Sequence, residues 1–325
     1  MMVPEAFKCR MLRLSGATAM LVVMIVLAAA VSVMAGEEEG QREQEVFSSA
    51  RQAVDAMVAA VTKNDFDGLL AILGPGSEDL VFSGDEVADR NGRQRFLESF
   101  EVNNRLEQVE ENHMVLIVGS RDYPFPIPII RRDEGWFFDT PAGIEEILNR
   151  RIGRNELHTI EVMQAYTDAQ REYACLQPDG ASEFARRLTS SEGKKDGLYW
   201  KVEEDEAQSP FGPLIARAAE EGYSGGLDED PPEPFHGYYF KILTAQGDHA
   251  NGGAFDYVAG GKMVLGFALV AYPARYGVSG IMTFIVNQEG VIYEKDLGEN
   301  TDAAAAMTAF DPDETWIMYR EDEAQ

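Results

Sequence analysis

Four residues in the C-terminal half carry side chains suited to binding a small ligand: His236, Tyr238, Arg275 and Tyr276. Gly237 follows the histidine, and a glycine lets a ligand or a second stretch of backbone come close. A histidine near an arginine and tyrosines could bind a carboxylate or a sugar. The alternative is structural, with the His236 ring bonded to a turn carbonyl at a sheet edge, and the sequence favours this alternative.

A second cluster consists of Arg150, Arg151 and Arg154, three basic residues in an acidic chain. Arg150 follows Glu146 by four residues, a spacing that places both side chains on one helix face and favours an ion pair. We expect these arginines to tie an N-terminal domain to a C-terminal one through half-buried carboxylates. Capture of an anionic ligand at the junction of the domains is the alternative.

Short motifs for catalysis or metal binding are incomplete. Ser279 lies in a Gly-x-Ser-Gly sequence, whose second glycine comes one residue too early for a nucleophile elbow. Ser191 and Lys194 match Ser-x-x-Lys, but its two companion motifs do not follow. The acidic run at 228–230 lacks the ligand spacing of a calcium loop. We therefore predict no catalytic set, no metal and no cofactor, and favour a non-enzymatic protein.

The charge of the chain restricts its partners. It has 56 acidic residues against 28 lysines and arginines, a net charge of −28 at pH 7. Such a chain repels phosphate backbones, so nucleic acid is not expected as a partner. Cys9 and Cys175 are the two cysteines, and Cys9 precedes the apolar N-terminal run. No disulfide is expected after processing, and Cys175 is predicted to be a half-buried apolar side chain.

Residues 1–35 have the pattern of a signal peptide: a basic start, then an apolar run that ends in a site signal peptidase reads. We predict cleavage before Gly36 and export to the periplasm or cell envelope. The alternative is an uncleaved N-terminal anchor, because the apolar run is long enough to cross a bilayer. Contact with a membrane is expected only in that case.

Hydrophobic periodicity predicts an α+β protein of two domains that follow an acidic spacer at residues 36–45. In residues 46–153, helices precede a curled antiparallel sheet, the order of a cystatin-like or NTF2-like roll, which often holds a pocket between helix and sheet. Residues 154–325 complete a long helical stretch and then form an antiparallel sheet. Gly153 interrupts the stretch, so two helices are expected to meet there. The strands expected are 114–118, 127–131, 136–139, 237–243, 255–258, 263–272, 280–286 and 291–296, and a last helix is expected over 303–310.

Long strings of the sequence carry a family likeness: FSSARQAVDAMVAA (47–60), YPFPIPIIR (123–131), HGYYFKILTAQG (236–247) and TFIVNQEGVIYEKDLG (283–298). Through these strings the chain, from Phe47 to about Trp316, resembles a bacterial family of exported proteins, domain-of-unknown-function family 2950. The resemblance implies a common fold and a cell-envelope setting, and it implies no catalytic residue.

The C-terminal half is also similar to the globular heads of type IV pilins and pseudopilins. The similarity lies in TDAQREYA (167–174), at the end of a helix, and in the strand sequence FALVAYPARYG (267–277). In pilins a hydrophobic helix runs directly into the head, whereas a whole domain separates the two here.

Taken together, these patterns predict an exported binding or scaffold protein whose partner is an envelope protein or polymer. One alternative is a hydrolase or small-molecule binder with a site between the domains near His236 and Arg275. A second alternative is a pilus- or secretion-associated subunit, which requires that the N-terminal segment stays uncleaved.

Overall fold

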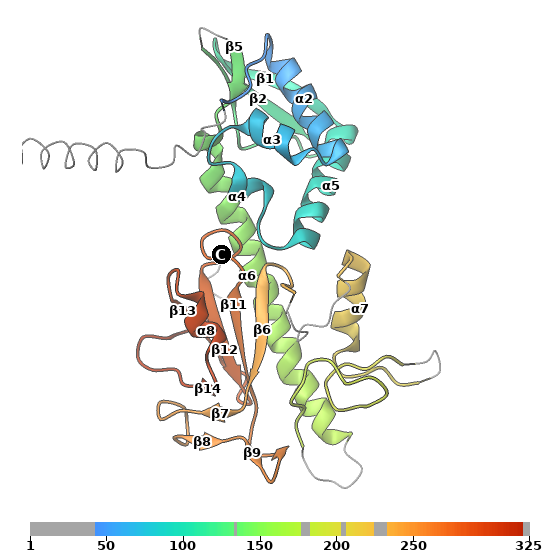
Figure 1. The fold of residues 1–325 in the computed structure, drawn as a ribbon, viewed down its shortest axis with the longest axis vertical. Coiled ribbons are helices and arrows are strands. Elements are labelled where there is room, and N and C mark those ends of the chain that lie inside the picture. The colour runs from blue at the N-terminus through green and yellow to red at the C-terminus, as the bar shows by residue number, and fades with distance from the viewer. Residues whose placement is uncertain (1–42, 133–134, 177–182, 203–205, 224–232, 321–325) are drawn as a thin grey trace, which may run out of the picture. The chain divides into compact units, whose positions relative to one another are not determined.

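The computed structural model describes residues 43–132, 135–176, 183–202, 206–223 and 233–320 (Figure 1). The predicted signal peptide, most of the acidic spacer and the acidic run at 228–230 lie outside these ranges. Within them, no helix has both the length and the apolar character needed to span a membrane. The predicted α+β class is confirmed, since helices are combined with several mainly antiparallel sheets.

The N-terminal half is a roll in which helices precede a five-stranded antiparallel sheet of order β1-β2-β4-β5, with β3 paired to β2. Ser49 caps the first described helix by accepting a hydrogen bond from the Gln52 amide at 3.2 Å. Asn64 ends that helix in the left-handed conformation. The helices are α2 (Ala50–Lys63), α3 (Phe66–Leu73), α4 (Glu78–Val81) and α5 (Glu86–Val102), and the strands are β1 (Asn104–Glu110), β2 (His113–Val118), β3 (Tyr123–Pro124), β4 (Ile129–Arg132) and β5 (Gly135–Phe138).

Helix α5 packs loosely. Asp85 caps its start by accepting a hydrogen bond from the Ala88 amide at 2.8 Å. None of its 17 residues is fully buried. Phe96, Leu97 and Phe100 pack only partly against the core of the roll, which is built by α2, α3 and the sheet. The helix therefore leaves space between itself and that core.

A single long helix, α6 (Thr140–Cys175), follows the roll and runs unbroken through Gly153. The expected meeting of two helices is therefore wrong, and the predicted boundary between 153 and 154 falls inside α6. A mid-helix glycine costs only about 1 kcal/mol. Packing on either side of it offsets that cost, because Ile147 packs against the core of the roll and Ile160 belongs to the C-terminal core.

The C-terminal half is built on a five-stranded antiparallel sheet of order β15-β13-β12-β11-β6. Apolar faces of this sheet and of α6 enclose its core, where Tyr166, Tyr238 and Phe284 are buried. The elements are α7 (Gly212–Glu221), β6 (Tyr238–Leu243), β7 (Ala245–Gln246), β8 (Phe255–Asp256), β9 (Val258–Ala259), β10 (Lys262–Met263), β11 (Ala268–Pro273), β12 (Met282–Asn287), β13 (Ile292–Asp296), α8 (Thr301–Ala305), β14 (Ala309–Phe310) and β15 (Ile317–Met318).

Two predicted elements of this half are wrong. The strand expected over 263–272 divides into β10 and β11, because the Val264 and Leu265 amides both bond to the carbonyl of Tyr257 at 3.1 Å. The helix expected over 303–310 ends at Ala305. The chain then forms β14, which pairs with β7.

Candidate functional site

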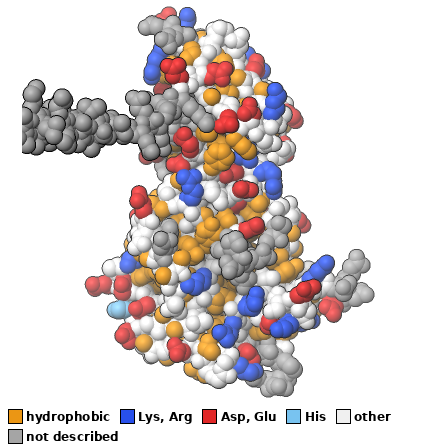
Figure 2. All heavy atoms as spheres, viewed as in Figure 1, with side chains coloured by type: hydrophobic (Ala, Val, Ile, Leu, Met, Phe, Trp, Pro, Cys, Tyr) orange, Lys and Arg blue, Asp and Glu red, His pale blue; other side chains and the backbone are white. Residues whose placement is uncertain are grey.

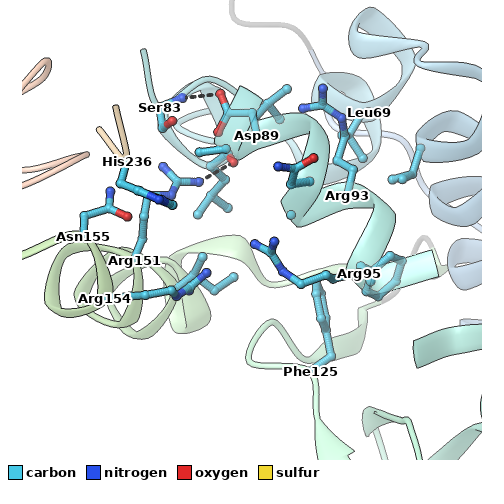
Figure 3. Close-up of a pocket in the computed structure, with 18 of the residues that line it drawn as sticks. Leu69, Ser83, Asp89, Arg93, Arg95, Phe125, Arg151, Arg154, Asn155 and His236 are labelled. Atoms are coloured by element: carbon cyan, nitrogen blue, oxygen red, sulfur yellow. Dashed lines mark hydrogen bonds between the residues drawn. The ribbon is translucent and has the colours of Figure 1, made fainter. Parts of the chain in front are cut away.

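The described residues enclose a cavity of about 690 Å³, with lining residues from α5 on one side and α6 on the other. The close-up in Figure 3 shows Arg95 and Arg93 on the α5 side and Arg151, Arg154 and Asn155 on the α6 side. This volume lies within the range of small-molecule pockets, roughly 300–1,000 Å³. The cavity arises because α5 stands off from the core of the roll.

One part of the cavity is apolar and opens onto the core of the roll. Its side chains come from α2, α3, α4, α5, α6 and the segment before β4, so they lie between helices and sheet. A roll of the predicted kind often holds a pocket at this place. The apolar lining consists of Met57, Val61, Leu69, Leu73, Leu80, Val81, Phe96, Phe125, Ile127 and Ile147.

The other part of the cavity is cationic. Four arginines line the cavity together with two carboxylates, which reverses locally the net charge of −28. Arg151 is held in place, since it donates to the carbonyls of Asp79 and Leu80 at 2.6 and 2.7 Å. The carboxylate of Asp89 accepts from the Ser83 amide at 2.8 Å. The remaining arginines are Arg93, Arg95 and Arg154.

Arg95 and Arg154 face the same space from α5 and α6 (Figure 3). Across the described ranges, neither guanidinium has a hydrogen bond or an ion pair with a protein group. Partial burial lowers the pKa of Arg154, and the nearby charge of Arg95 lowers it further. Arginine nevertheless stays protonated at neutral pH. Among the described residues these two like charges have no counter-ion, and because both arginines are exposed, solvent screens part of their repulsion.

Two buried nitrogen atoms at the cavity lack a hydrogen-bond partner among the described residues: Nε of Arg93 and Nδ1 of His158. The Arg93 guanidinium lies over the ring of Phe66, 4.9 Å from its centroid. Leaving a buried donor unpaired costs about 1–3 kcal/mol.

His236 closes one side of the cavity. Its Nε2 lies 3.1 Å from a carboxylate oxygen of Glu221, and its ring meets that of His158 edge to face at 4.2 Å. Burial lowers the pKa of His236 to about 3, and His158, Arg217, Arg95 and Arg154 contribute in that order. Burial is the main cause, so this imidazole is neutral at pH 7 and bonds to its neighbours without carrying charge.

The backbone at His236 is held in an uncommon conformation. His236 and Gly237 both have positive φ, at 49° and 76°. A carboxylate oxygen of Asp85 accepts from the Gly237 amide at 2.8 Å and from the Tyr223 hydroxyl at 2.9 Å. Burial raises the pKa of Asp85 despite these bonds. The cap of α5 thereby also fixes the turn that presents His236.

Of the four ligand-binding candidates of the sequence, His236 lines the cavity and the other three do not. Tyr238 is buried in the C-terminal core and donates to the Met282 carbonyl at 3.0 Å. Arg275 binds the Phe82 carbonyl and, at 2.6 Å, the Asp79 carboxylate, so it joins the C-terminal sheet to the roll. The Tyr276 hydroxyl is exposed and contacts Asp296 at 3.2 Å.

The arginines of α6 have three different roles. Arg150 forms an exposed ion pair with Glu146 on the same helix. Arg151 ties α6 to the roll through backbone carbonyls, where the sequence suggested carboxylates. Arg154 lines the cavity, which is the placement that the anion-binding alternative requires.

Sequence reasoning missed the arginines of α5 and also His158. Arg93 and Arg95 form an Arg-x-Arg pattern that signals only a basic stretch. On a helix, side chains two residues apart point roughly 200° away from each other, so a shared cavity is not expected from their spacing. His158 follows Arg154 by four residues, and this spacing places both on one helix face.

Other reactive side chains lie away from the cavity. The Ser279 hydroxyl bonds to the amide and the carbonyl of Arg275, at 2.9 and 3.1 Å, and so stabilises a turn. Cys175 is exposed, not half-buried as predicted, because it lies about 200° around α6 from the buried Tyr173. The described ranges contain no group of three His, Cys, Asp or Glu side chains arranged to hold a metal ion.

Comparison with curated proteins and with solved structures gave no match. The similarity to pilin heads therefore stays a prediction. A family model described as protein of unknown function (DUF2950) matches residues 44–318, which is most of the chain. The chain thus belongs to the DUF2950 family.

Proposed function

We propose that this chain is an exported binding protein that holds a small organic anion in the cavity between α5 and α6. The observation that carries the proposal is the pair Arg95 and Arg154, two exposed cationic side chains of the cavity that have no counter-ion among the described residues, in a chain of charge −28. An anion between them would relieve their mutual repulsion and form charge-assisted hydrogen bonds.

The chemistry of the cationic groups favours binding over proton transfer. Arginine keeps its proton at physiological pH, so it can orient an anion but cannot act as an acid or base there. His236 is neutral at pH 7 and is bonded to Glu221. It adds one hydrogen-bonding group to the wall of the site without adding charge.

The cellular setting is part of the proposal. The signal-peptide pattern of residues 1–35 supports export, and the periplasm or cell envelope is the compartment proposed. Envelope proteins and polymers remain the proposed source of partners. Acidic and basic side chains are interspersed over the face drawn in Figure 2, which supports leaving nucleic acid out of the proposal.

Isothermal titration of the exported protein with octanoate, benzoate and phenyl phosphate tests the proposal. We expect at least one of these anions to bind, while octanol and benzamide bind at least ten-fold more weakly. Arg154→Gln and Arg95→Gln should each weaken anion binding by about ten-fold or more, because a charge-assisted hydrogen bond contributes about 1.5–3 kcal/mol.

Arg150→Gln is the matched control. It removes an arginine one turn away on the same helix, and that arginine is exposed and paired with Glu146. Anion affinity should not change in this variant. The proposal is wrong if none of the three anions binds at millimolar concentration, or if Arg150→Gln weakens binding as much as Arg154→Gln does.

A further inference from the structure

We infer that the anion carries a hydrocarbon tail, and that this tail lies beneath α5 and completes the core of the roll. The inference rests on the proposed function and names its ligand class, an alkanoate-like amphipathic anion. Three independent features of the cavity support it: the incomplete packing of α5, the origin of the apolar lining, and the separation of charge from apolar surface.

The first feature is the packing of α5. A helix on a protein surface normally buries an apolar stripe against the core. None of the 17 residues of α5 is fully buried, although Phe96, Leu97 and Phe100 lie on its core side. By contrast, α2 has 14 residues and buries six of them. The apolar face of α5 therefore lacks part of its packing partner.

The second feature is the lining of the cavity beneath α5. Met57, Leu69, Leu73 and Ile127 belong to the core of the roll, yet all four also line the cavity. Protein interiors contain few voids larger than a water molecule. The space of about 690 Å³ is partly open to solvent, so it is a cleft beneath α5 and not a void sealed inside the core. Apolar atoms of a ligand would restore the contacts that these side chains lack.

The third feature is polarity. Figure 3 shows Arg154, Asn155 and His236 on the α6 side of the cavity and Arg95 on the α5 side, with Leu69 and Phe125 farther from His236. Arg93 lies beside Leu69, and its guanidinium covers the ring of Phe66. A molecule with its anionic group at Arg154 and Arg95 would direct the rest of its length toward apolar side chains. Arg154 and Arg95 would thus bind the anionic group of the ligand, and the apolar side chains beneath α5 would bind its hydrocarbon tail.

The test is a titration of the exported protein with straight-chain alkanoates of four to ten carbons, each below its micelle concentration. Affinity should rise by about four-fold for each added methylene group, which corresponds to about 0.8 kcal/mol. Arg154→Gln should weaken every member of the series by a similar factor and leave the dependence on chain length unchanged.

Two glycine variants locate the tail. Gly92 lies on α5 and lines the cavity, and a Cβ added there would meet only Nη2 of Arg95, at 3.9 Å. Because a leucine at this position extends into the cavity beside Arg95, Gly92→Leu should weaken butanoate moderately and the long alkanoates much more. Gly153→Leu is the control, since Gly153 is exposed on α6 and nothing lies within 4 Å of an added Cβ. It should bind the whole series as wild type does, and circular dichroism confirms that both variants are folded.

The outcomes separate the two proposals. Affinity that is the same for butanoate and decanoate, but still lost in Arg154→Gln, overturns the tail and leaves anion binding intact. A length dependence that Gly92→Leu does not alter places the tail elsewhere and also overturns the inference. If no alkanoate, benzoate or phenyl phosphate binds, the proposed function itself fails.

Discussion

The two hydrophobic cores of this chain differ in how completely their own side chains fill them. In the C-terminal core, Tyr166 donates to the Ala268 carbonyl at 3.0 Å, and Gln170 bridges that tyrosine to both backbone groups of Ala185. The core of the roll instead opens onto a cavity, where Arg93 Nε has no partner among the described groups. A closed core is sufficient for a fold, whereas the open core bordered by Arg95 and Arg154 is the feature on which the proposed ligand rests.

The largest effect expected from this difference comes from truncating one phenylalanine in each core. Phe267 is buried in the C-terminal core, with the rings of Tyr166 and Phe184 at 5.7 and 4.9 Å. Phe267→Ala should lower the free energy of unfolding by about 3–5 kcal/mol. Phe96→Ala should cost roughly 1 kcal/mol, because Phe96 borders the cavity and has fewer contacts to lose. Urea denaturation measures both, and equal losses would mean that the two cores are packed alike.

A second prediction concerns the closed end of the roll, where α6 begins. Gly143 packs so closely on the segment before β4 that an added Cβ would lie 2.5 Å from the carbonyl oxygen of Pro126. Gly143→Ala should therefore lower the free energy of unfolding by about 1–3 kcal/mol. Differential scanning calorimetry would show a lower Tm. An unchanged Tm would show that the backbone at Gly143 and Pro126 moves apart easily enough to admit a methyl group, which would contradict close packing there.

The third prediction uses pH at the border between the two cores. The pKa of His236 is about 3 in the folded chain, against about 6.5 when unfolded. As pH falls from 7 to 5, the unfolded chain takes up a proton at this residue and the folded chain does not. The free energy of unfolding should therefore fall by roughly 1–2 kcal/mol more in wild type than in His236→Asn.

This comparison isolates His236 from its titratable neighbours. His158 and Glu221 contact its ring and are present in both proteins. The raised pKa of Asp85 has the opposite effect on stability, because it favours the folded state as pH falls. Asp85 is present in both proteins, so its contribution cancels when their free energies of unfolding are compared. Asparagine tolerates the positive φ at this position. Identical pH profiles in urea denaturation would contradict a neutral, buried imidazole.

The smallest effect is expected at the open end of the roll. Gly92→Ala should raise the free energy of unfolding by about 0.5–1 kcal/mol, because alanine is the better helix former and the new methyl group meets only the end of the Arg95 side chain, at 3.9 Å. This change in the free energy of unfolding has the opposite sign to the change expected for Gly143→Ala. Chemical denaturation of both variants under one set of conditions tests the pair, and a loss at Gly92 would show that α5 is packed more tightly than described.

The sequence predicts elements well where local chemistry decides them. Three features follow from short-range signals: the cap at Ser49 from a serine three residues before Gln52, the end of α3 from Gly74-Pro75, and the turn between β9 and β10 from Gly260-Gly261. It misses β1, whose alternation of charged and apolar residues is weak. It also joins β10 to β11, because the backbone bonds from Val264 and Leu265 to Tyr257 leave no signal in hydrophobic periodicity.

The candidate site is harder to predict because α5 and α6 contribute to it from separate parts of the chain. Arg154 was identified as part of a basic cluster and His236 as a ligand-binding candidate, and both line the cavity. Arg275 was grouped with His236 on chemistry alone, but it bonds to Phe82 and Asp79 instead. The shape of the cavity depends on how far α5 stands from the core, and no local pattern encodes that distance.

The continuity of α6 limits how modular this protein can be. The helix has 36 residues and so is about 54 Å long, with Ile147 against one core and Met163 inside the other. A fragment that ends at the predicted boundary would divide the helix and separate Arg154 from Arg151. The two halves are therefore expected to be inherited as one evolutionary unit and not exchanged between proteins, which agrees with a family match that spans both.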